Sequence, residues 1–161
     1  ENSLFSKFFA ADGMFDQSVI DQIGAENLKG NISITQAASD TDDASYKAYA
    51  EAYKATGLDP AAPYAAHGYD ATFLMALAIE KAGAADRSKI KDALRAVSNG
   101  SGEIVRPGEW AKAKKLIVEG KDINYEGAVG PVDFDENGDV SGVFAVNIVG
   151  DDGKWSKSLI K

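Results

Sequence analysis

The segment Pro63-Tyr-Ala-Ala-His-Gly-Tyr-Asp-Ala-Thr-Phe-Leu-Met-Ala-Leu-Ala-Ile-Glu-Lys-Ala-Gly83 decides the fold of this chain. It is the longest apolar segment, and only Thr72 interrupts the run from Ala71 to Ile79. Its Ala, Leu and Met content favours a helix over a strand, and Gly83 is a natural residue to end that helix. The run is shorter than the roughly 20 apolar residues that cross a bilayer. Because apolar residues cover nearly every side, we expect the helix to be buried between layers and to cover a sheet.

The composition limits the functions that this chain can have. Its 161 residues are 45% apolar and 26% charged, which is enough for an ordinary domain with a core. The net charge of −8 argues against a nucleic-acid partner, because phosphate binding requires a basic face. The absence of cysteine excludes disulfides, thiolate catalysis and cysteine-ligated zinc.

The first residues give little information about the compartment. The chain begins Glu-Asn-Ser-Leu-Phe, with neither the basic nor the apolar region of a signal peptide, and no transmembrane segment is visible in the sequence. A strand is expected almost at once, at Phe8–Ala11, as though the sequence had been entered midway. A missing signal peptide therefore does not argue against export.

The pattern after this strand predicts a parallel α/β unit. Asp12-Gly13 is a turn dipeptide, Asp16 can cap a short helix that Gly24 ends, and residues 31–35 alternate as a strand does. Further helices are expected after the polar loop at residues 39–43, after a cap at Asp86 or Ser88, and around Trp110. A stripe of tyrosines on the first of these is expected to pack within the protein. A hairpin with its turn at Asn137-Gly138 is expected between Val132 and Val140.

No pattern of residues points to an enzyme or a metal site. The segment from Asp133 to Asp139 matches the first half of a calcium-binding loop, but Phe144 stands where the bidentate Glu belongs, and a hairpin explains the same residues. His67 is the single histidine, so it cannot pair with another His or a Cys. Asp12 directly follows a strand, where open α/β sheets bind ligands, although a plain turn explains it equally well. No cofactor is expected.

Three stretches together resemble one family. They are Phe8–Gly13 with Leu28-Lys29-Gly30, Tyr69-Asp70-Ala71 with Ala78–Gly83, and Tyr125–Gly127 through Gly130–Val140. In order and content they resemble the C-terminal half of the branched-chain amino-acid-type, Leu/Ile/Val-binding-protein-like substrate-binding proteins of bacterial ABC transporters. The match covers nearly the whole chain.

This resemblance implies a type I periplasmic binding fold, with parts of two three-layer α/β lobes joined by a hinge and the N-terminal half missing. Residues 1–36 would belong to lobe 2, residues 37–140 to lobe 1, and residues 141–161 would return to lobe 2. The sheets would then be incomplete and part of the central helix uncovered. The fragment would pair with its missing N-terminal half or with another chain.

The resemblance also implies the site residues. Asp12 falls where the family places the acid that binds the α-ammonium of the ligand, although the family more often has Glu there. Tyr64 falls where a side chain lines the apolar pocket, and Met14, Phe15 and His67 are adjacent to these positions. The groups that bind the carboxylate would lie in the missing half.

The function implied is that of a periplasmic, non-enzymatic solute-binding protein. It would bind an amino acid or a related small carboxylate in a cleft between the lobes and deliver it to an inner-membrane ABC permease. Two alternatives come from other classes. One is a ligand-sensing domain of a receptor or regulator, and the other is a small α/β enzyme that uses Asp12 and His67.

Overall fold

The computed structural model describes residues 5–37 and 41–160, and it confirms the expected α/β class. Contacts between residues divide the chain into two compact units. Unit 1 contains the described residues up to Ala37 and those from Gly142 onward, and unit 2 contains those between them, through Ser141.

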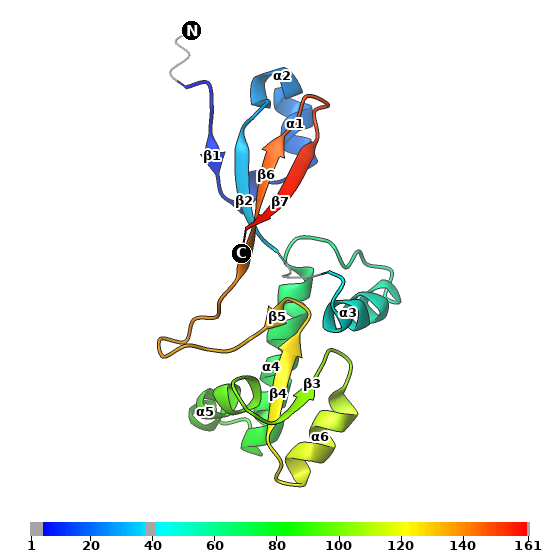
Figure 1. Cartoon of the computed structure of the whole chain (residues 1–161), viewed down its shortest axis with the longest axis vertical. Coiled ribbons are helices and arrows are strands. Elements are labelled where there is room, and N and C mark those ends of the chain that lie inside the picture. The colour runs from blue at the N-terminus through cyan, green and yellow to red at the C-terminus, as the bar shows by residue number, and fades with distance from the viewer. Residues whose placement is uncertain (1–4, 38–40, 161) are drawn as a thin grey trace. The chain divides into compact units, whose positions relative to one another are not determined.

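Unit 1 is a four-stranded sheet with short helices (Figure 1). The strand order is β1-β2-β6-β7, and β1 is parallel to β2 while the other neighbouring pairs are antiparallel. The elements in chain order are β1 (Phe9–Ala10), η1 (Asp12–Met14), α1 (Gln17–Ile23), α2 (Ala25–Leu28), β2 (Ile32–Ala37), β6 (Val143–Val149) and β7 (Trp155–Ile160).

The start of unit 1 confirms the expected strand, helix and parallel strand. Asp16 accepts a hydrogen bond from Ser18 N at 2.7 Å and caps α1, because it satisfies one of the N–H groups that a helix start leaves unpaired. Gly24 ends α1 with φ of 96°, which a residue with a Cβ adopts only under strain. Ile20 and Leu28 of the two helices pack against Val149 of β6.

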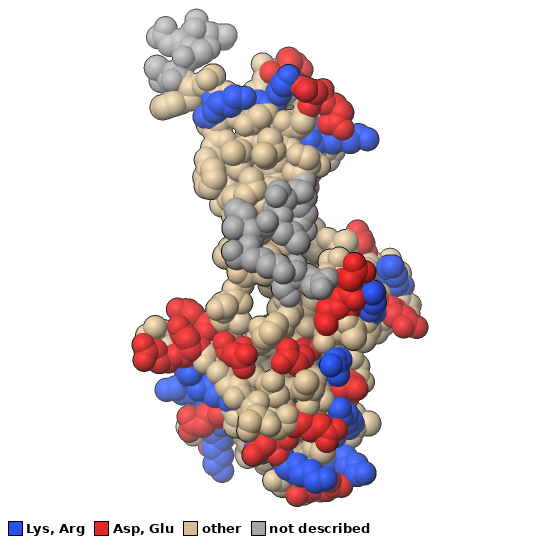
Figure 2. All heavy atoms as spheres, in the orientation of Figure 1, with Lys and Arg blue, Asp and Glu red and all other residues tan. Residues whose placement is uncertain are grey.

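One side of the unit 1 sheet is covered and the other is not. Alternate residues of β2 and β6 are buried on the side of α1 and α2, whereas Phe144 and Ile148 on the other side are 44% and 38% exposed. Phe9 of the edge strand β1 is 74% exposed. On the displayed face of this unit, charged side chains gather at the end that carries α2 and the turn between β6 and β7 (Figure 2). One face of the unit 1 sheet is therefore apolar and exposed to solvent.

Unit 2 packs helices around a small sheet in which β4 lies between β3 and β5. The β3–β4 pair is parallel and the β4–β5 pair is antiparallel. The elements in chain order are α3 (Ala44–Lys54), α4 (Ala65–Ala82), α5 (Arg87–Ser98), β3 (Glu103–Val105), α6 (Trp110–Val118), β4 (Ile123–Gly127) and β5 (Gly130–Pro131). The strands β3 and β4 were not predicted from the sequence.

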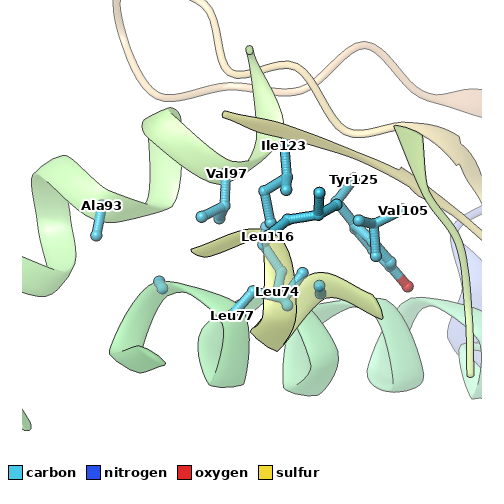
Figure 3. Close-up of a cluster of buried hydrophobic side chains, with 10 residues drawn as sticks. Leu74, Leu77, Ala93, Val97, Val105, Leu116, Ile123 and Tyr125 are labelled. Carbon is cyan, nitrogen blue, oxygen red and sulfur yellow. The ribbon is translucent and has the colours of Figure 1, made fainter. Parts of the chain in front are cut away.

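The core of unit 2 lies between α4, α5, α6 and the sheet. Leu74 and Leu77 of α4 point toward Ile123 and Tyr125 of β4, and Val97 of α5 approaches from the side (Figure 3). The other members of this buried cluster are Ala78, Ala93, Val105, Ala113 and Leu116.

Two expectations for unit 2 need correction. The long helix α4 is not buried on every side, because Met75 and Ile79 on one face are 43% and 38% exposed. This exposure agrees instead with the expectation that part of the central helix is uncovered. The expected hairpin between Val132 and Val140 is reduced to a single bridge, Phe134 with Val140. Asp135 explains this, because its carboxylate accepts the backbone N–H of Asn137 and Asp139 and holds a tight turn instead of a ladder.

Candidate functional site

In unit 1, Asp12 lies at the carboxyl end of β1. It begins the short helix η1, and Phe15 N donates to Asp12 O at 2.8 Å. The Asp12 side chain is exposed and Met14 is half-buried. The ring of Phe15 packs edge-on against Trp155 of β7, with centroids 5.5 Å apart. Phe15 therefore helps to hold the segment after η1 on unit 1.

In unit 2, Tyr64 marks the start of α4. Its φ is 62°, and it is the one residue other than glycine with a positive φ in the part of the chain that the structure describes. Residues with a Cβ rarely adopt this left-handed region, and strained positions of this kind gather at binding sites. Tyr64 is 42% exposed, and the centroid of its ring lies 6.0 Å from that of His67, one turn into the helix.

An open groove of about 530 Å³ runs along the beginning of α4. We call it the tyrosine groove, and it is lined by Tyr53, Ala62, Pro63, Tyr64, Ala65, Gly68, Tyr69 and Thr72. Tyrosines combine a large apolar surface with a polar hydroxyl, so this lining suits an apolar or aromatic group with a polar end. The tyrosine stripe of α3 is divided between two roles. Tyr49 is fully buried and donates to Pro60 O at 3.1 Å, as expected for packing, whereas Tyr53 lines the groove.

His67 is half-buried near this groove. Burial lowers the pKa of His67, and the negative charge of Asp70 opposes that shift. A histidine with a lowered pKa is neutral at physiological pH, so it can donate and accept hydrogen bonds without bringing a charge to the site.

Asp70 is a buried carboxylate that was not among the site residues predicted from the sequence. It is 2% exposed, and its Oδ1 accepts from the hydroxyl of Tyr125 at 2.8 Å and from Ala128 N at 2.9 Å. Its Oδ2 accepts from Val129 N at 2.8 Å. Burial raises the pKa of Asp70, and the three donated hydrogen bonds lower it. The carboxylate thus joins α4 to the turn between β4 and β5.

Gly127 completes this arrangement. A Cβ at Gly127 would lie 2.5 Å from Asp70 Oδ2, so a glycine is needed for the turn to approach the carboxylate. A signal for Asp70 was present in the sequence, because Asp70, Leu74 and Leu77 share the spacing of one helix face. Its partners lie more than 50 residues away, which no local pattern reveals.

A second pocket of about 280 Å³ lies at the carboxyl ends of β3 and β4. We call it the arginine pocket, and it is lined by Asp43, Ser45, Ile104, Arg106, Glu126, Gly127, Gly130 and Pro131. Burial raises the pKa of Glu126, the charge of Asp133 adds to this, and Arg106 opposes it. No local sequence pattern reveals this pocket, because its charged residues come from separate parts of the chain.

The residues expected to bind a ligand form two groups. Asp12, Met14 and Phe15 lie together in unit 1, and Tyr64 and His67 lie together in unit 2. Their roles toward a ligand stay predictions. Within the described residues, no group of three His, Cys, Asp or Glu side chains is arranged to hold a metal ion. No helix among the described residues is long and apolar enough to span a membrane.

Comparison with known proteins gives one family. The family described as the receptor family ligand-binding region matches residues 3–149. The chain is similar to the leucine-binding protein LivK of Thermotoga maritima, with 30% identity and a TM-score of 0.62. That similarity covers 96% of this chain and 37% of LivK.

Two further proteins are similar to the chain. One is the branched-chain amino acid transporter substrate-binding protein LivJ of Streptococcus pneumoniae, which was solved in complex with isoleucine. It shows 22% identity and a TM-score of 0.59, and the similarity covers 95% of this chain and 36% of LivJ. The other is the chemotactic signal transduction system substrate-binding protein BasB of Halobacterium salinarum, 37% identical over 75 residues. That match covers 47% of this chain and 18% of BasB. The chain thus spans about a third of the two solved relatives.

Proposed function

Because the chain belongs to the receptor family ligand-binding region, we propose that it forms part of an exported protein that binds a small solute and delivers it to an ABC permease. The proposed solute is an amino acid or a related small carboxylate, and no chemical step is proposed. The similarity to a leucine-binding protein across 96% of the chain, at 30% identity, carries this proposal.

Unit 1 is proposed to be part of lobe 2, and unit 2 part of lobe 1. The division of contacts supports this, because the chain passes between the units next to Ala37 and again between Ser141 and Gly142. The segments from Thr35 to Ala37 and near Gly142 are then the hinge, which would let the two lobes close on a solute.

Asp12 is proposed to accept hydrogen bonds from the ammonium group of the ligand. Its exposed carboxylate at the carboxyl end of a strand supports this role. Tyr64 and His67 are proposed to line the apolar side of the site from lobe 1. Tyr64 is supported by its place in the tyrosine groove, and His67 by the contact of its ring with that of Tyr64. Met14 is a weaker candidate for contact, and the packing of Phe15 on Trp155 favours a supporting role for that ring.

The uncovered surfaces support pairing with further protein, which we propose to be the N-terminal half of the same protein. These surfaces are the sheet face with Phe144 and Ile148 in unit 1 and the face of α4 with Met75 and Ile79 in unit 2. Apolar surface of this kind is costly to leave in water. Gel filtration of the 161-residue chain tests this, and a compact monomer of 17.0 kDa would contradict it.

Isothermal titration calorimetry of the full-length protein against the twenty amino acids and small carboxylates tests the function. We expect the wild-type protein to bind at least one of these compounds. Asp12→Asn should raise the Kd for amino acids by about tenfold or more, because a hydrogen bond to a charged group contributes about 1.5–3 kcal/mol. Asp21→Asn is the matched control, because Asp21 is exposed on α1 of the same unit. Absence of binding to every compound would reject the proposal.

A second candidate function is ligand sensing, which the similarity to a chemotactic substrate-binding protein favours. In that case the loaded protein would contact a membrane-bound signal transducer instead of a permease. Deleting the gene separates the two functions. Loss of uptake of the bound solute, with chemotaxis intact, supports transport, and the reverse result supports sensing.

A further inference from the structure

The strand β6 carries a polar residue where an apolar one is expected. Asn147 lies in the middle of the run Val-Phe-Ala-Val-Asn-Ile-Val and is fully buried. Its Nδ2 donates to Ser33 O at 3.2 Å and to Thr35 Oγ1 at 3.1 Å, and its Oδ1 has no partner among the described residues. A buried amide with an unpaired oxygen costs stability, and an apolar side chain of the same shape would avoid that cost. The stability of the sheet alone therefore does not explain Asn147.

The partners of Asn147 lead toward Asp12. Ser33 lies opposite Asn147 in the sheet register and is also fully buried. The hydroxyl of Ser33 donates to the carbonyl oxygen of Ala11 at 2.9 Å, and Ala11 is the residue before Asp12. A connected set of polar groups thus runs from β6 through β2 to the backbone that carries Asp12.

The short helix η1 lies near the surface of unit 1. None of its residues is buried, and its backbone bonds are short-range: Met14 N to Ala11 O at 3.3 Å, Phe15 N to Asp12 O at 2.8 Å and Asp16 N to Met14 O at 3.0 Å. A segment with so little buried surface opens easily unless something outside it holds the backbone. The hydrogen bond from Ser33 anchors the backbone of Ala11, the residue before Asp12, from the covered side of the sheet.

We propose that Ser33 and Asn147 are positioning residues for Asp12. Ser33 fixes the backbone of Ala11, and Asn147 fixes Ser33 and Thr35, so that the Asp12 carboxylate is already in place when a ligand arrives. A carboxylate held in this way loses less conformational freedom on binding, which raises affinity without a new contact. The proposal rests on the proposed function in one respect, namely that Asp12 binds the ligand.

The anchor can be tested without any ligand. Amide hydrogen exchange at Met14, Phe15 and Asp16 is measured in the full-length protein and in the variants Ser33→Ala and Asn147→Leu. We expect exchange at these amides to be about 2- to 10-fold faster in both, the change that follows from one lost neutral hydrogen bond. We also expect Asn147→Leu to change the unfolding temperature little, because removing the unpaired Oδ1 offsets the loss of the two bonds that Nδ2 donates. A merely structural Asn147 would lower that temperature and leave η1 unchanged.

Ser156→Ala is the matched control. The Ser156 hydroxyl also donates to a backbone carbonyl, that of Ile148 at 3.1 Å, but it does so from the exposed face of the same sheet. It should leave exchange in η1 unchanged.

Calorimetry with L-leucine as the probe completes the test. We expect the Kd to rise about 2- to 10-fold in Ser33→Ala and to stay constant in Ser156→Ala. Unchanged exchange in η1 in both variants would overturn the proposal, and so would faster exchange with an unchanged Kd. If η1 loosens but the wild-type protein binds no leucine, the anchor stands and the leucine-binding function fails.

Discussion

Asp70 gives the sharpest test of how unit 2 is held together, and the change to make is Asp70→Asn. The substitution keeps the shape of the side chain but replaces one carboxylate oxygen with an NH₂ group. Oδ1 can still accept from Tyr125 and Ala128, whereas the new NH₂ group would face the N–H of Val129. One hydrogen bond is lost, two donors oppose each other, and the two remaining bonds lose the negative charge.

The expected cost follows from these contacts. A hydrogen bond to a charged group contributes about 1.5–3 kcal/mol, and a buried donor without a partner costs about 1–3 kcal/mol. Because Asp70 is 2% exposed, water cannot replace the lost acceptor. We expect Asp70→Asn to lower the free energy of unfolding of unit 2 by about 2–3 kcal/mol. Tyr125→Phe removes one donor and leaves the carboxylate with two partners, so we expect a smaller loss of about 1–2 kcal/mol.

The two tryptophans make the measurement specific to each unit. Trp110 packs edge-on against Phe73 in unit 2, and Trp155 packs against Phe15 in unit 1. Urea unfolding of the 161-residue chain carrying Trp155→Phe is therefore followed through the fluorescence of Trp110. With a slope near 1.5 kcal/mol per molar urea, the midpoint should fall by between about 1.3 and 2 M in Asp70→Asn.

A matched control variant and a double-mutant cycle test the role of Asp70. Asp92→Asn makes the same chemical change at an exposed position on α5 of the same unit and should move the midpoint very little. Because Asp70 and Tyr125 share a hydrogen bond, the double variant should cost less than the sum of the single variants. A midpoint for Asp70→Asn equal to that of Asp92→Asn would refute the anchoring role, and strict additivity would refute the contact with Tyr125.

Two further predictions concern the helix α4. The single His67 should titrate by NMR below its ordinary pKa of 6.5 because of burial, and Asp70→Asn should lower that pKa further by removing a nearby negative charge. With this lowered pKa, the unfolded chain binds a proton at His67 more readily than the folded chain does. The free energy of unfolding should therefore fall as the pH drops from 6.5 through the lowered pKa, and His67→Gln should remove this dependence. A measured pKa of His67 at or above 6.5 would contradict the prediction. Leu77→Ala should cost about 2–5 kcal/mol in urea unfolding of the 161-residue chain, because Leu77 is fully buried, whereas Met75→Ala, at an exposed position of the same helix, should cost less than about 1 kcal/mol. Equal costs at the two positions would show that the buried side of α4 is wrongly assigned.

The ends of the helices could be predicted from the sequence because the signals for them are local. Asp16, Asp43 and Asp86 each cap a helix by accepting the N–H of the second residue after them, and Gly83 ends α4 in the left-handed conformation that a glycine adopts easily. Each of these signals operates within a few residues. For this reason the sequence pattern predicted the cap at Asp16 and the end at Gly83 correctly, whereas it placed the cap of α3 only within a polar loop and left Asp86 and Ser88 as alternatives for α5.

The strand β4 was missed although it carries a pattern. Ile123, Tyr125 and Gly127 face the core while Asn124 and Glu126 are half-buried, which is the alternation of a strand. Glycines at 127, 130, 138 and 142 made the region after Asn124 look like short apolar pieces separated by turns. One of them, Gly127, is required by the approach of Asp70, and that requirement is visible only in three dimensions.

The same distinction applies to the site residues. Asp12 could be chosen because a carboxylate after a strand is a local pattern, and Tyr64 because of a family resemblance. What holds them comes from remote parts of the chain: Ser33 reaches Ala11 across 22 positions, and Asp70 binds a turn that begins 58 positions later. Asp70 lies in α4 only one turn after His67, so the first turns of α4 and the β4–β5 turn are fixed by one carboxylate. A change in the β4–β5 turn should therefore reach the tyrosine groove through Asp70, although the turn contributes no residue to that groove.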